Sequence, residues 1–564
     1  MKIFLAGNWV DKAKKIEVRN PFDNSVIDTV PRADAGDLEK ALGYAERGAK
    51  VMAKLSSYER WKILRKAADT MAARNEELGQ LISKEEGKII AEGRGEANRA
   101  VETIMGSAEE AKRLHGETVP LDADPTGSKK FGFTLRVPCG VVAAIAPFNF
   151  PLNLVAHKVG PALAAGNSVI VKPASDTPLS ALKLTEILLE AGLPPEGIQC
   201  ITGSGGEIGD ALVADRRVRK VTFTGSREVG ERICHTAGIK KVTMELGSNS
   251  PVIIMPDADL DKVATVLAMT GYGNAGQTCI STQRVLTAKK VYGDLLSAVK
   301  PKVEALTIGN QLDEKSKVGP MVKESEAVRV DDWINEAVRS GARLVAGGGR
   351  RGAIYMPTVV ADVKPDMRIS RDELFGPAVA VTPFETIEEA IALANDSVYG
   401  LAAGIFTENV EWAMKFAREA EAGNLHVNWG SQWRVDLMPY GGLKESGFGK
   451  EGPKYAVQAQ PLQAAFDRLA QVLRAGVMGP LVRSRPIPSA LCRDHNILWI
   501  RCQRFGDQFF ADIGTVRVRR VDEVDAQLNG TAEDSKRRSG IFRRSPDSVA
   551  GKTHCSETKT ANRQ

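Results

Sequence analysis

The stretch VVAAIAPFNFPLNLVAHKVGPALAAGNSVIVKPAS, residues 141–175, decides the fold. It contains two short apolar runs with an amphipathic run between them. The alternation continues downstream, with apolar runs at 141–146, 168–171, 198–201, 220–223 and 241–244 and amphipathic runs at 152–165, 178–191, 206–214 and 227–237. This pattern is typical of a parallel sheet with helices on both faces. Such a sheet binds ligands at the carboxyl ends of its strands.

The rest of the chain predicts further structure around this sheet. At 564 residues the chain is too long for a single core. Helical spacing of apolar residues over 35–115 predicts helices, and the α/β texture over 251–425 predicts a second α/β domain. A turn at 120–127 precedes an alternating stretch at 130–137. That stretch predicts a strand or hairpin arm that projects from the body.

Composition argues against several classes of function. The seven cysteines have no CxxC spacing and the six histidines no metal-ligand spacing, so we expect no metal site. No segment approaches 18 uninterrupted apolar residues, and the N-terminal apolar run is too short for a signal peptide. We therefore expect no membrane span and a cytoplasmic location. Residues 1–460 carry 58 Lys and Arg against 59 Asp and Glu, which gives no sign of nucleic-acid binding.

Three polar side chains are candidates for chemistry. Cys279 lies among small and hydroxyl residues at 276–282, where a thiolate would be a strong nucleophile, although a lone cysteine is also often a buried structural residue. Glu245 ends a predicted strand 34 residues earlier and could act as a general base. Asn149, between two prolines, could donate to an oxyanion, or it could form an Asx turn.

Two glycine-rich turns are candidates for binding cofactor phosphates. The turn at 202–209 superficially resembles a dinucleotide fingerprint, which alone is a weak signal. The turn at 223–230 joins a strand to a helix and would place the amides of Gly225 and Ser226 at a helix N-terminus, where anions bind. Lys172 ends a predicted strand and could hold ribose or phosphate oxygens, or it could be a solvated surface lysine.

Seven motifs, in order and spacing, resemble the aldehyde dehydrogenase superfamily. They are PFNFPLN (147–153), VKPAS (171–175), FTGSREVG (223–230), ELGS (245–248), GQTC (276–279), DELFGP (372–377) and PYGGLKESGFGKEG (439–452). The resemblance covers about residues 1–458 and is too extensive to arise by chance. One departure is Ser248, which replaces the second glycine of the family's ELGG pattern.

The resemblance implies a role for each matching residue. It implies that Cys279 is the nucleophile, that Glu245 is the base that deprotonates the hydrolytic water, and that Asn149 holds the oxyanion together with the Cys279 backbone amide. It further implies a proton-relay role for Glu451. The cofactor, NAD or NADP, would contact a set of residues that comprises Lys172, Ser175, Gly225, Ser226, Glu373 and Phe375.

The resemblance also implies a domain plan with two α/β domains that contain parallel-rich sheets. A Rossmann-like cofactor domain would comprise 1–119 and 139–248, and a catalytic domain would comprise 249–445. Residues 120–138 would form a β-arm for oligomerisation, and 446–460 would return to the cofactor domain. The implied assembly is a homodimer or homotetramer, with the active site between the two domains.

The choice of cofactor and substrate depends on a few positions. Strongly NAD-selective relatives carry a glutamate where this chain has Ser175, so we expect NADP to be accepted, alone or alongside NAD. Relatives that oxidise phosphate-bearing aldehydes carry arginine where this chain has Thr278. Arg99 and Arg434 match positions where relatives contact an anionic substrate end, although each could instead be solvated or salt-bridged. The neighbourhood looks most like lactaldehyde-type enzymes, so we expect a small hydroxylated or acidic aldehyde.

Two other functions remain open from the sequence. A CoA-acylating aldehyde dehydrogenase would resemble this chain, but such enzymes generally lack the glutamate that Glu245 matches. A catalytically silent binding protein on the same fold should have lost Cys279 or Glu245, and both are present.

Residues 461–564 differ from the rest of the chain, with 15 Arg and 3 Lys among them. The abrupt change suggests a frameshifted or read-through end, and a basic arm for nucleic acid or membrane is the alternative. We expect this segment to pack poorly, with at most one helix near 462–475. We also expect the terminal strand to be missing, which would leave a sheet edge incompletely paired and weaken a dimer.

Overall fold

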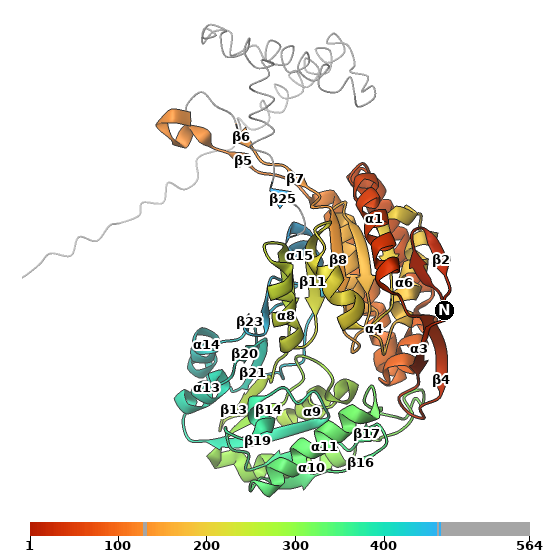
Figure 1. Cartoon of the computed structure of the whole chain (residues 1–564). Coiled ribbons are helices and arrows are strands. Elements are labelled where there is room, and N and C mark those ends of the chain that lie inside the picture. The colour runs from red at the N-terminus through yellow and green to blue at the C-terminus, as the bar shows by residue number, and fades with distance from the viewer. Residues whose placement is uncertain (128–131, 460–461, 464–564) are drawn as a thin grey trace, which may run out of the picture. The chain divides into compact units, whose positions relative to one another are not determined.

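The computed structural model describes residues 1–127, 132–459 and 462–463 (Figure 1). Its first sheet has eight strands in the order β2-β1-β10-β9-β8-β11-β12-β24. The five central strands are parallel and comprise β8 (Val141–Ile145), β9 (Ser168–Lys172), β10 (Ile198–Cys200), β11 (Val218–Thr224) and β12 (Lys241–Glu245). Antiparallel strands flank them, namely β1 (Ile3–Leu5) and β2 (Asn8–Val10) at one edge and β24 (Gly447–Phe448) at the other. The five apolar runs of the sequence therefore form one sheet, as predicted.

Alternate residues of β8 enter two different cores. Val142 and Ala144 pack in one core, whereas Val141 and Ala143 pack in the other. Because side chains alternate across a strand, the sheet is buried on both faces. The helices around this sheet are α1 (Ala35–Met52), α2 (Ser57–Ala73), α3 (Asn75–Glu86), α4 (Ile90–Arg113), α5 (Asn153–Ala164), α6 (Leu179–Glu190), α7 (Asp210–Ala214), α8 (Arg227–Ala237) and α15 (Pro453–Ala459).

One predicted helix differs from the structure. The sequence predicts a helix over 206–214, but the chain forms a π-helical turn over Gly205–Gly209 before α7 begins. Ser204 caps this turn by accepting a hydrogen bond from the Glu207 amide. Three glycines in five residues weaken a regular helix, which accounts for the wider turn.

A second sheet confirms the predicted second α/β region. Its seven strands follow the order β15-β18-β19-β14-β13-β21-β22. They are β13 (Pro251–Ile254), β14 (Arg284–Ala288), β15 (Arg343–Ala346), β18 (Thr358–Ala361), β19 (Ala378–Phe384), β21 (Ala402–Phe406) and β22 (Asn424–Val427), of which β15 alone is antiparallel to its neighbour in this sheet. The helices of this region are α9 (Leu260–Thr270), α10 (Tyr292–Glu304), α11 (Glu324–Arg339), α12 (Arg368–Arg371), α13 (Ile387–Asn395) and α14 (Val410–Glu419). The predicted boundary at residue 248 falls between β12 and β13, the point where the chain leaves one sheet for the other.

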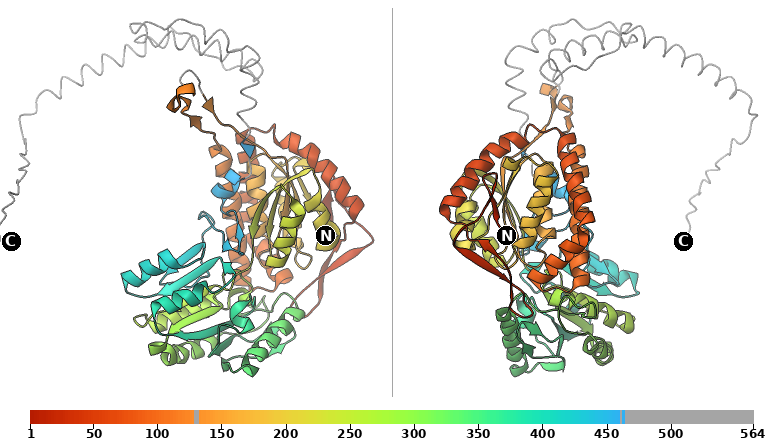
Figure 2. Two further views of the ribbon diagram at one scale, coloured as in Figure 1. Left: turned by 60° about the vertical axis from the view of Figure 1, so that its left-hand side comes forward. Right: turned by 90° about the vertical axis from the view of Figure 1, so that its right-hand side faces the viewer.

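Short strands form separate two-stranded ladders. β3 (Lys15–Arg19) pairs with β4 (Val26–Pro31), β16 (Arg350–Arg351) with β17 (Ile354–Tyr355), and β20 (Tyr399–Gly400) with β23 (Leu443–Lys444). β6 (Gly132–Phe133), within the predicted arm at 120–138, pairs with β5 (Thr118–Val119), which lies just before that arm. Figure 2 shows in two views that this hairpin extends away from the first sheet.

The prediction for the start of the C-terminal segment is wrong at residues 462–463. These residues form strand β25 (Leu462–Gln463), which pairs antiparallel with β7 (Arg136–Val137) of the arm. An edge strand presents unpaired amides and carbonyls, so any extended segment that passes it can add to the ladder. The other calls on the segment up to residue 564 lie outside the described residues. Among the residues described, no helix is both long and apolar enough to cross a bilayer.

Candidate active site

Cys279 lies in a tight loop that begins after α9. The loop contains a short 3-10 turn, Gly273–Gly276, in which Asn274 and Ala275 have left-handed backbone angles, with φ of 52° and 51°. A Cβ on Gly276 would lie 2.1 Å from the Gly376 carbonyl oxygen, so only glycine fits there. This packing presses the nucleophile loop against the segment that carries Glu373 and Phe375.

The Cys279 thiol lies 3.1 Å from the hydroxyl oxygen of Tyr440. Burial raises the pKa of the thiol to about 12, although the Tyr440 contact opposes the shift. The thiol is therefore protonated at neutral pH in the protein without ligands. A base or a nearby positive charge is needed to turn it into a nucleophile.

A cavity of about 600 Å³ connects the predicted catalytic residues. Its walls include Arg99, Glu245, Cys279, Arg434, Tyr440 and Glu451. Glu245 comes from the carboxyl end of β12, and Cys279 comes from the loop between α9 and β14. The structure thus brings together residues that are far apart in the sequence, at the carboxyl end of a parallel strand.

Glu245 is buried beside this cavity. Neither of its carboxylate oxygens has a hydrogen-bond partner among the described residues. Burial, followed by the negative charge of Glu451, raises the pKa of Glu245 well above its ordinary value. A buried carboxyl without partners loses its proton only at a cost, which makes its anion a stronger base than a solvated glutamate.

Glu451 is held by two buried cations. Its carboxylate lies 3.4 Å from the Lys158 ammonium and 3.1 Å from the Arg434 guanidinium. Lys158 also donates to the Thr224 hydroxyl at 2.5 Å. Burial would raise the pKa of Glu451, but the charges around it, those of His157, Lys158 and Arg434, hold the pKa below its ordinary value. Glu451 and its partners therefore form a polar network, and Thr224, Arg434 and Glu451 line the same cavity as Glu245.

Asn149 is buried next to the nucleophile loop. Its side-chain Nδ2 donates to the carbonyl of Gln277 at 2.8 Å, two residues before Cys279. Its Oδ1 has no hydrogen-bond partner among the described residues. Asn149 lies against the same loop as the nucleophile, and its oxyanion role stays a prediction because its amide bonds to a main-chain carbonyl here.

The two candidate substrate arginines are both salt-bridged, as the alternative reading of the sequence allowed. Arg99 lies 2.9 Å from Asp436, and Arg434 binds Glu451. Arg434 also stacks on the ring of Tyr440, with its Cζ 3.9 Å from the ring centroid. Its Nε has no hydrogen-bond partner among the described residues. Thr278, the third candidate, accepts a hydrogen bond from Gln432 at 3.1 Å.

Four of the six candidate cofactor residues lie at the carboxyl ends of strands of the first sheet, namely Lys172, Ser175, Gly225 and Ser226. Lys172 is 6% exposed, and within the described part of the chain its ammonium has one hydrogen-bond partner, the Pro173 carbonyl at 3.5 Å. Burial lowers the pKa of this lysine. Ser226 caps α8, an 11-residue helix, by accepting from the Val229 amide. A buried lysine with a weak partner and a helix N-terminus suit an anionic ligand such as a dinucleotide. The Gly225 amide already donates to the Glu245 carbonyl at 3.1 Å, so its predicted contact with the cofactor stays a prediction.

The weaker of the two glycine-rich turns also borders this lysine. Ser175 donates to the Gly203 carbonyl at 3.3 Å, and a Cβ on Gly209 would lie 3.7 Å from Lys172 Cε. At the other turn, a Cβ on Gly225 would lie 2.4 Å from the ring of Phe223, so glycine is required by packing. Both turns therefore lie beside predicted cofactor residues.

Glu373 and Phe375 line a small crevice with Thr278, next to the nucleophile loop. Glu373 accepts a hydrogen bond from the Ser248 amide at 2.9 Å, and burial raises its pKa to about 7. Phe375 has a left-handed φ of 50°, and its ring meets Phe148 edge-on at 5.9 Å. A non-glycine residue with this φ is a strained feature of the kind found near functional sites.

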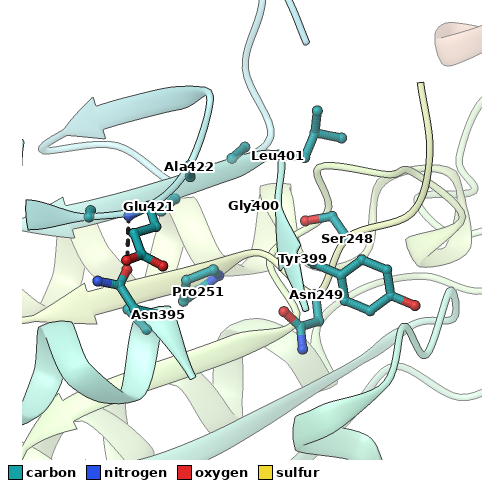
Figure 3. Close-up of a pocket in the computed structure, with 13 residues that line it drawn as sticks. Ser248, Asn249, Pro251, Asn395, Tyr399, Gly400, Leu401, Glu421 and Ala422 are labelled. Atoms are coloured by element: carbon teal, nitrogen blue, oxygen red, sulfur yellow. Dashed lines mark hydrogen bonds between the residues drawn. The ribbon is translucent and has the colours of Figure 1, made fainter. Parts of the chain in front are cut away.

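A separate small pocket lies beyond Ser248. Figure 3 shows Tyr399, Ser248 and Asn249 on one side of it and Asn395 on the other, where the Asn395 side chain accepts from the Glu421 amide. Its volume of about 10 Å³ has room for one water molecule at most. It is therefore no candidate for the substrate site.

Several residues of the site were missed by sequence reasoning. Tyr440, which contacts Cys279, lies inside a quoted motif but was given no role. Lys158 and His157 lie on α5, whose residues are otherwise apolar apart from Asn153 and are all buried. Charged or titratable side chains in so apolar a helix are the signal that could have identified them, because such groups are rarely buried without a partner. Within the described residues no group of His, Cys, Asp and Glu could hold a metal ion.

Comparison with known proteins gives consistent matches. The model of the aldehyde dehydrogenase family matches residues 9–460. The chain is 48% identical to 3-sulfolactaldehyde dehydrogenase of Priestia aryabhattai, over 81% of this chain and 95% of that protein. It is 38% identical to lactaldehyde dehydrogenase of Methanococcus aeolicus, over 81% of this chain and 97% of that protein.

Solved structures match over the same region. Aldehyde dehydrogenase 21 of Physcomitrella patens, in complex with the product succinate, superposes with a TM-score of 0.79 at 39% identity, over 82% of this chain and 96% of that one. The glyceraldehyde-3-phosphate dehydrogenase GapN of Methanocaldococcus jannaschii, complexed with NADP, superposes with a TM-score of 0.77 at 35% identity, over 80% of this chain and 98% of that one.

Proposed function

Because the chain belongs to the aldehyde dehydrogenase family, we propose that it oxidises a small hydroxylated or acidic aldehyde to the carboxylic acid, with NAD or NADP as the oxidant. The observation that carries this proposal is the cavity of about 600 Å³, because Cys279, Glu245 and two arginines all line it. A nucleophile, a base and cationic groups in one cavity suit covalent oxidation of a polar aldehyde.

The first half of the reaction is the addition of Cys279 to the aldehyde. The Cys279 sulfur bonds to the carbonyl carbon, and the thiol proton passes to a base of the site. The negative charge that develops on the carbonyl oxygen is stabilised by the Asn149 amide and the Cys279 backbone N–H. A bound NAD or NADP would supply the hydride acceptor for oxidation of the resulting thiohemiacetal. Oxidation leaves the acyl group on Cys279 as a thioester.

The second half is hydrolysis of this thioester. Glu245 takes a proton from a water molecule, and the water oxygen attacks the thioester carbon. The carbon–sulfur bond then breaks, and the thiolate of Cys279 recovers a proton. Within the described residues neither carboxylate oxygen of Glu245 has a hydrogen-bond partner, which supports this role because a base must have a free oxygen for the proton it accepts. The same observation favours water over CoA as the acyl acceptor.

The site fits a dinucleotide through the residues already described. We assign contacts with its phosphates and adenosine ribose to Lys172, Gly225 and Ser226, and contacts with the nicotinamide ribose and ring to Glu373 and Phe375. The weakly partnered ammonium of Lys172 supports the first assignment. We also propose a homodimer or homotetramer. The hairpin of β5 and β6 is the candidate contact surface between subunits.

Ser175 predicts that the enzyme accepts NADP. A serine carries no negative charge to repel a 2′-phosphate, and the buried ammonium of Lys172, three residues earlier, is a candidate to bind it. We expect the kcat/KM ratio to favour NAD by less than about a thousandfold, or about 4 kcal/mol. Ser175→Glu should lower kcat/KM for NADP by about a hundredfold through charge repulsion and leave that for NAD within about threefold. Ser175→Ala is the control, and strong NAD selectivity in the unmodified protein would contradict the prediction.

The substrate class rests on the arginines and on the relatives. The Arg434 side chain is buried at the cavity wall, and its Nε–H has no hydrogen-bond partner among the described residues. Two relatives are named as dehydrogenases of 3-sulfolactaldehyde and lactaldehyde. A buried guanidinium with an unused donor suits a carboxylate, sulfonate or hydroxyl group of the substrate. We therefore expect short polar aldehydes to be preferred over long aliphatic ones.

The test is a panel of aldehydes assayed with NAD and NADP, each with and without CoA. Lactaldehyde, succinate semialdehyde and 3-sulfolactaldehyde are compared with butanal and hexanal. We expect kcat/KM to be at least about tenfold higher for the polar aldehydes, or about 1.4 kcal/mol. Equal values would contradict the substrate class, a requirement for CoA would favour the acylating reaction, and the absence of cofactor reduction for every aldehyde would contradict the proposed function itself.

A further inference from the structure

Lys88 is a buried cation to which the proposed chemistry gives no role. It follows α3, and its side chain is 1% exposed. Its ammonium donates to the main-chain carbonyl of Asn149 at 2.7 Å and forms an ion pair with Glu96 at 2.8 Å. The ammonium also lies 3.8 Å from the ring centroid of Phe150. Each of these contacts is made either with the segment that contains Asn149 and Phe150 or with Glu96.

Glu96 connects the same loop to α4. One carboxylate oxygen pairs with Lys88, and the other accepts from the amides of Leu152 and Asn153 at 2.9 Å and 3.1 Å. These amides lie at the start of α5, where helix N–H groups lack partners within the helix. The Lys88–Glu96 pair therefore holds both ends of the five-residue segment that begins at Asn149.

Asn274 reaches the same carbonyl from the nucleophile loop. Its Nδ2 donates to the Asn149 carbonyl at 3.1 Å and to the carboxylate of Glu86 at 3.0 Å. Its own backbone amide donates to Glu92 at 2.9 Å. Its φ of 52° is one that asparagine tolerates better than most residues. Asn274 is thus a rigid part of the loop that ends in Cys279.

The two donors converge on one oxygen. Lys88 approaches the Asn149 carbonyl from the helical layer of the first sheet, and Asn274 approaches it from the loop that carries the nucleophile. The Asn149 side chain in turn donates to the Gln277 carbonyl of the nucleophile loop, which Asn274 Nδ2 also approaches at 3.4 Å. Burying a lysine costs several kcal/mol of free energy unless its partners compensate. An apolar side chain would therefore fill the same space at a lower cost in free energy if the role were only structural. The charge is instead placed on the peptide that orients Asn149.

We propose that Lys88 and Asn274 are positioning residues that hold the Asn149 loop and the Cys279 loop in register, so that the Asn149 amide meets the oxyanion formed on the substrate. This inference rests on the proposed function, because it requires Asn149 to act as an oxyanion donor. A displacement of about 1 Å at a reacting centre can lower a rate about a hundredfold. Loss of either donor to the Asn149 carbonyl should therefore slow the addition step without weakening cofactor binding.

The experiment is a double-mutant cycle on the full-length protein. Lys88→Met/Glu96→Gln removes both charges together, keeps the apolar stem over Phe150, and leaves an oxygen to accept from the α5 amides. We expect it to lower kcat/KM for the aldehyde about 10- to 100-fold, with KM for NAD or NADP unchanged. Asn149→Ala alone should lower kcat/KM about 100- to 1,000-fold. In the Asn149→Ala background the first change should have less than about a threefold further effect.

The control is Glu85→Gln. Glu85 lies on α3, three residues before Lys88, and is as buried as Lys88, but it accepts from the first amides of α6, at Leu179 and Ser180. The Glu85→Gln variant should be less stable. Any effect that it has on kcat/KM should be the same in the unmodified protein and in the Asn149→Ala background. Asn274→Gly, which the left-handed backbone tolerates, repeats the cycle should the charge-removing variant not fold.

The outcomes separate the inference from the proposed function. Effects of Lys88→Met/Glu96→Gln or Asn274→Gly that disappear in the Asn149→Ala background support the inference. Effects that multiply with that of Asn149→Ala, as for Glu85→Gln, overturn it and leave the oxyanion role of Asn149 intact. Unchanged activity in Asn149→Ala overturns the oxyanion role, and the inference with it.

Discussion

Replacing Cys279 by alanine should abolish aldehyde oxidation, with kcat lowered by roughly 10⁴-fold or more. That loss corresponds to about 5.4 kcal/mol of transition-state stabilisation. The reason is that no thiohemiacetal forms without the sulfur, so hydride would have to leave an aldehyde that nothing has activated. Steady-state cofactor reduction with the preferred aldehyde measures the loss.

The fold should survive this substitution. The thiol is half-buried, and its described side-chain hydrogen bond, to Tyr440, is a weak one to sulfur, so the free energy of unfolding should change by about 1 kcal/mol or less. Titration with NADH or NADPH should give an unchanged Kd. Cys234→Ala, at a half-buried cysteine of α8, is the control and should keep full activity. Turnover retained by Cys279→Ala would rule out the nucleophile assignment.

The sequence predicted the central strands well because they are buried on both faces. The apolar run at 168–171 became β9, Ser168–Lys172, and the run at 141–146 became β8, Val141–Ile145. A doubly covered strand has no solvent side, so it appears in the sequence as an uninterrupted apolar run. Lys172 and Glu245 are the last residues of β9 and β12. Because the ends of these strands could be predicted, both residues could be placed at the ligand-binding edge of the sheet from the sequence.

The edge strands could not be predicted in the same way. β2 has two exposed residues among its three, Asn8 and Trp9, and β25 has only two residues in all. Such strands are too short to show the two-residue alternation of apolar and polar side chains that identifies a strand in a sequence. They form because a neighbouring strand edge offers unpaired amides and carbonyls. For this reason the expectation of at most one helix near 462–475 did not include the strand at Leu462–Gln463.

The polar network of the site was equally hidden. Lysines are ordinarily solvated, so nothing in the sequence was a reason to assign a role to Lys88 or Lys158. In the structure the side chain of each is 1% exposed. Their partners, Glu96 and Glu451, come from distant elements, and spacing in one sequence cannot pair them. Arg99 and Arg434 were placed in the substrate site by resemblance, but only the structure shows that acidic residues already neutralise them in part.

Replacing Glu245 by glutamine should stop the reaction at the thioester. The first turnover should still release one equivalent of reduced cofactor per active site, because the addition and oxidation steps require Cys279 and Asn149. The steady-state rate should fall by about 10²- to 10⁴-fold, the range that general-base catalysis contributes. Intact-protein mass spectrometry should detect the acyl group on Cys279, and added hydroxylamine should release it.

The stability of this variant provides an independent check on the environment of Glu245. Burial and Glu451 raise the pKa of Glu245 in the folded protein above its unfolded value of about 4.3. The folded state therefore binds more protons, and the free energy of unfolding decreases as the pH rises from about 4.3 through the folded pKa. Glutamine mimics the protonated acid and removes this penalty. The Glu245→Gln midpoint should thus equal or exceed that of the unmodified protein at pH 6, with a larger difference at pH 8.

Glu85→Gln provides the comparison for both measurements. Burial also raises the pKa of Glu85, to about 7, but its carboxylate accepts hydrogen bonds from Leu179 and Ser180, so glutamine cannot replace it without loss. That variant should be less stable and should turn over without accumulating a thioester. A normal steady-state rate in Glu245→Gln would remove Glu245 from the hydrolytic step. A lower midpoint at every pH would show that its carboxylate has a stabilising partner, contrary to the two free oxygens seen in the cavity.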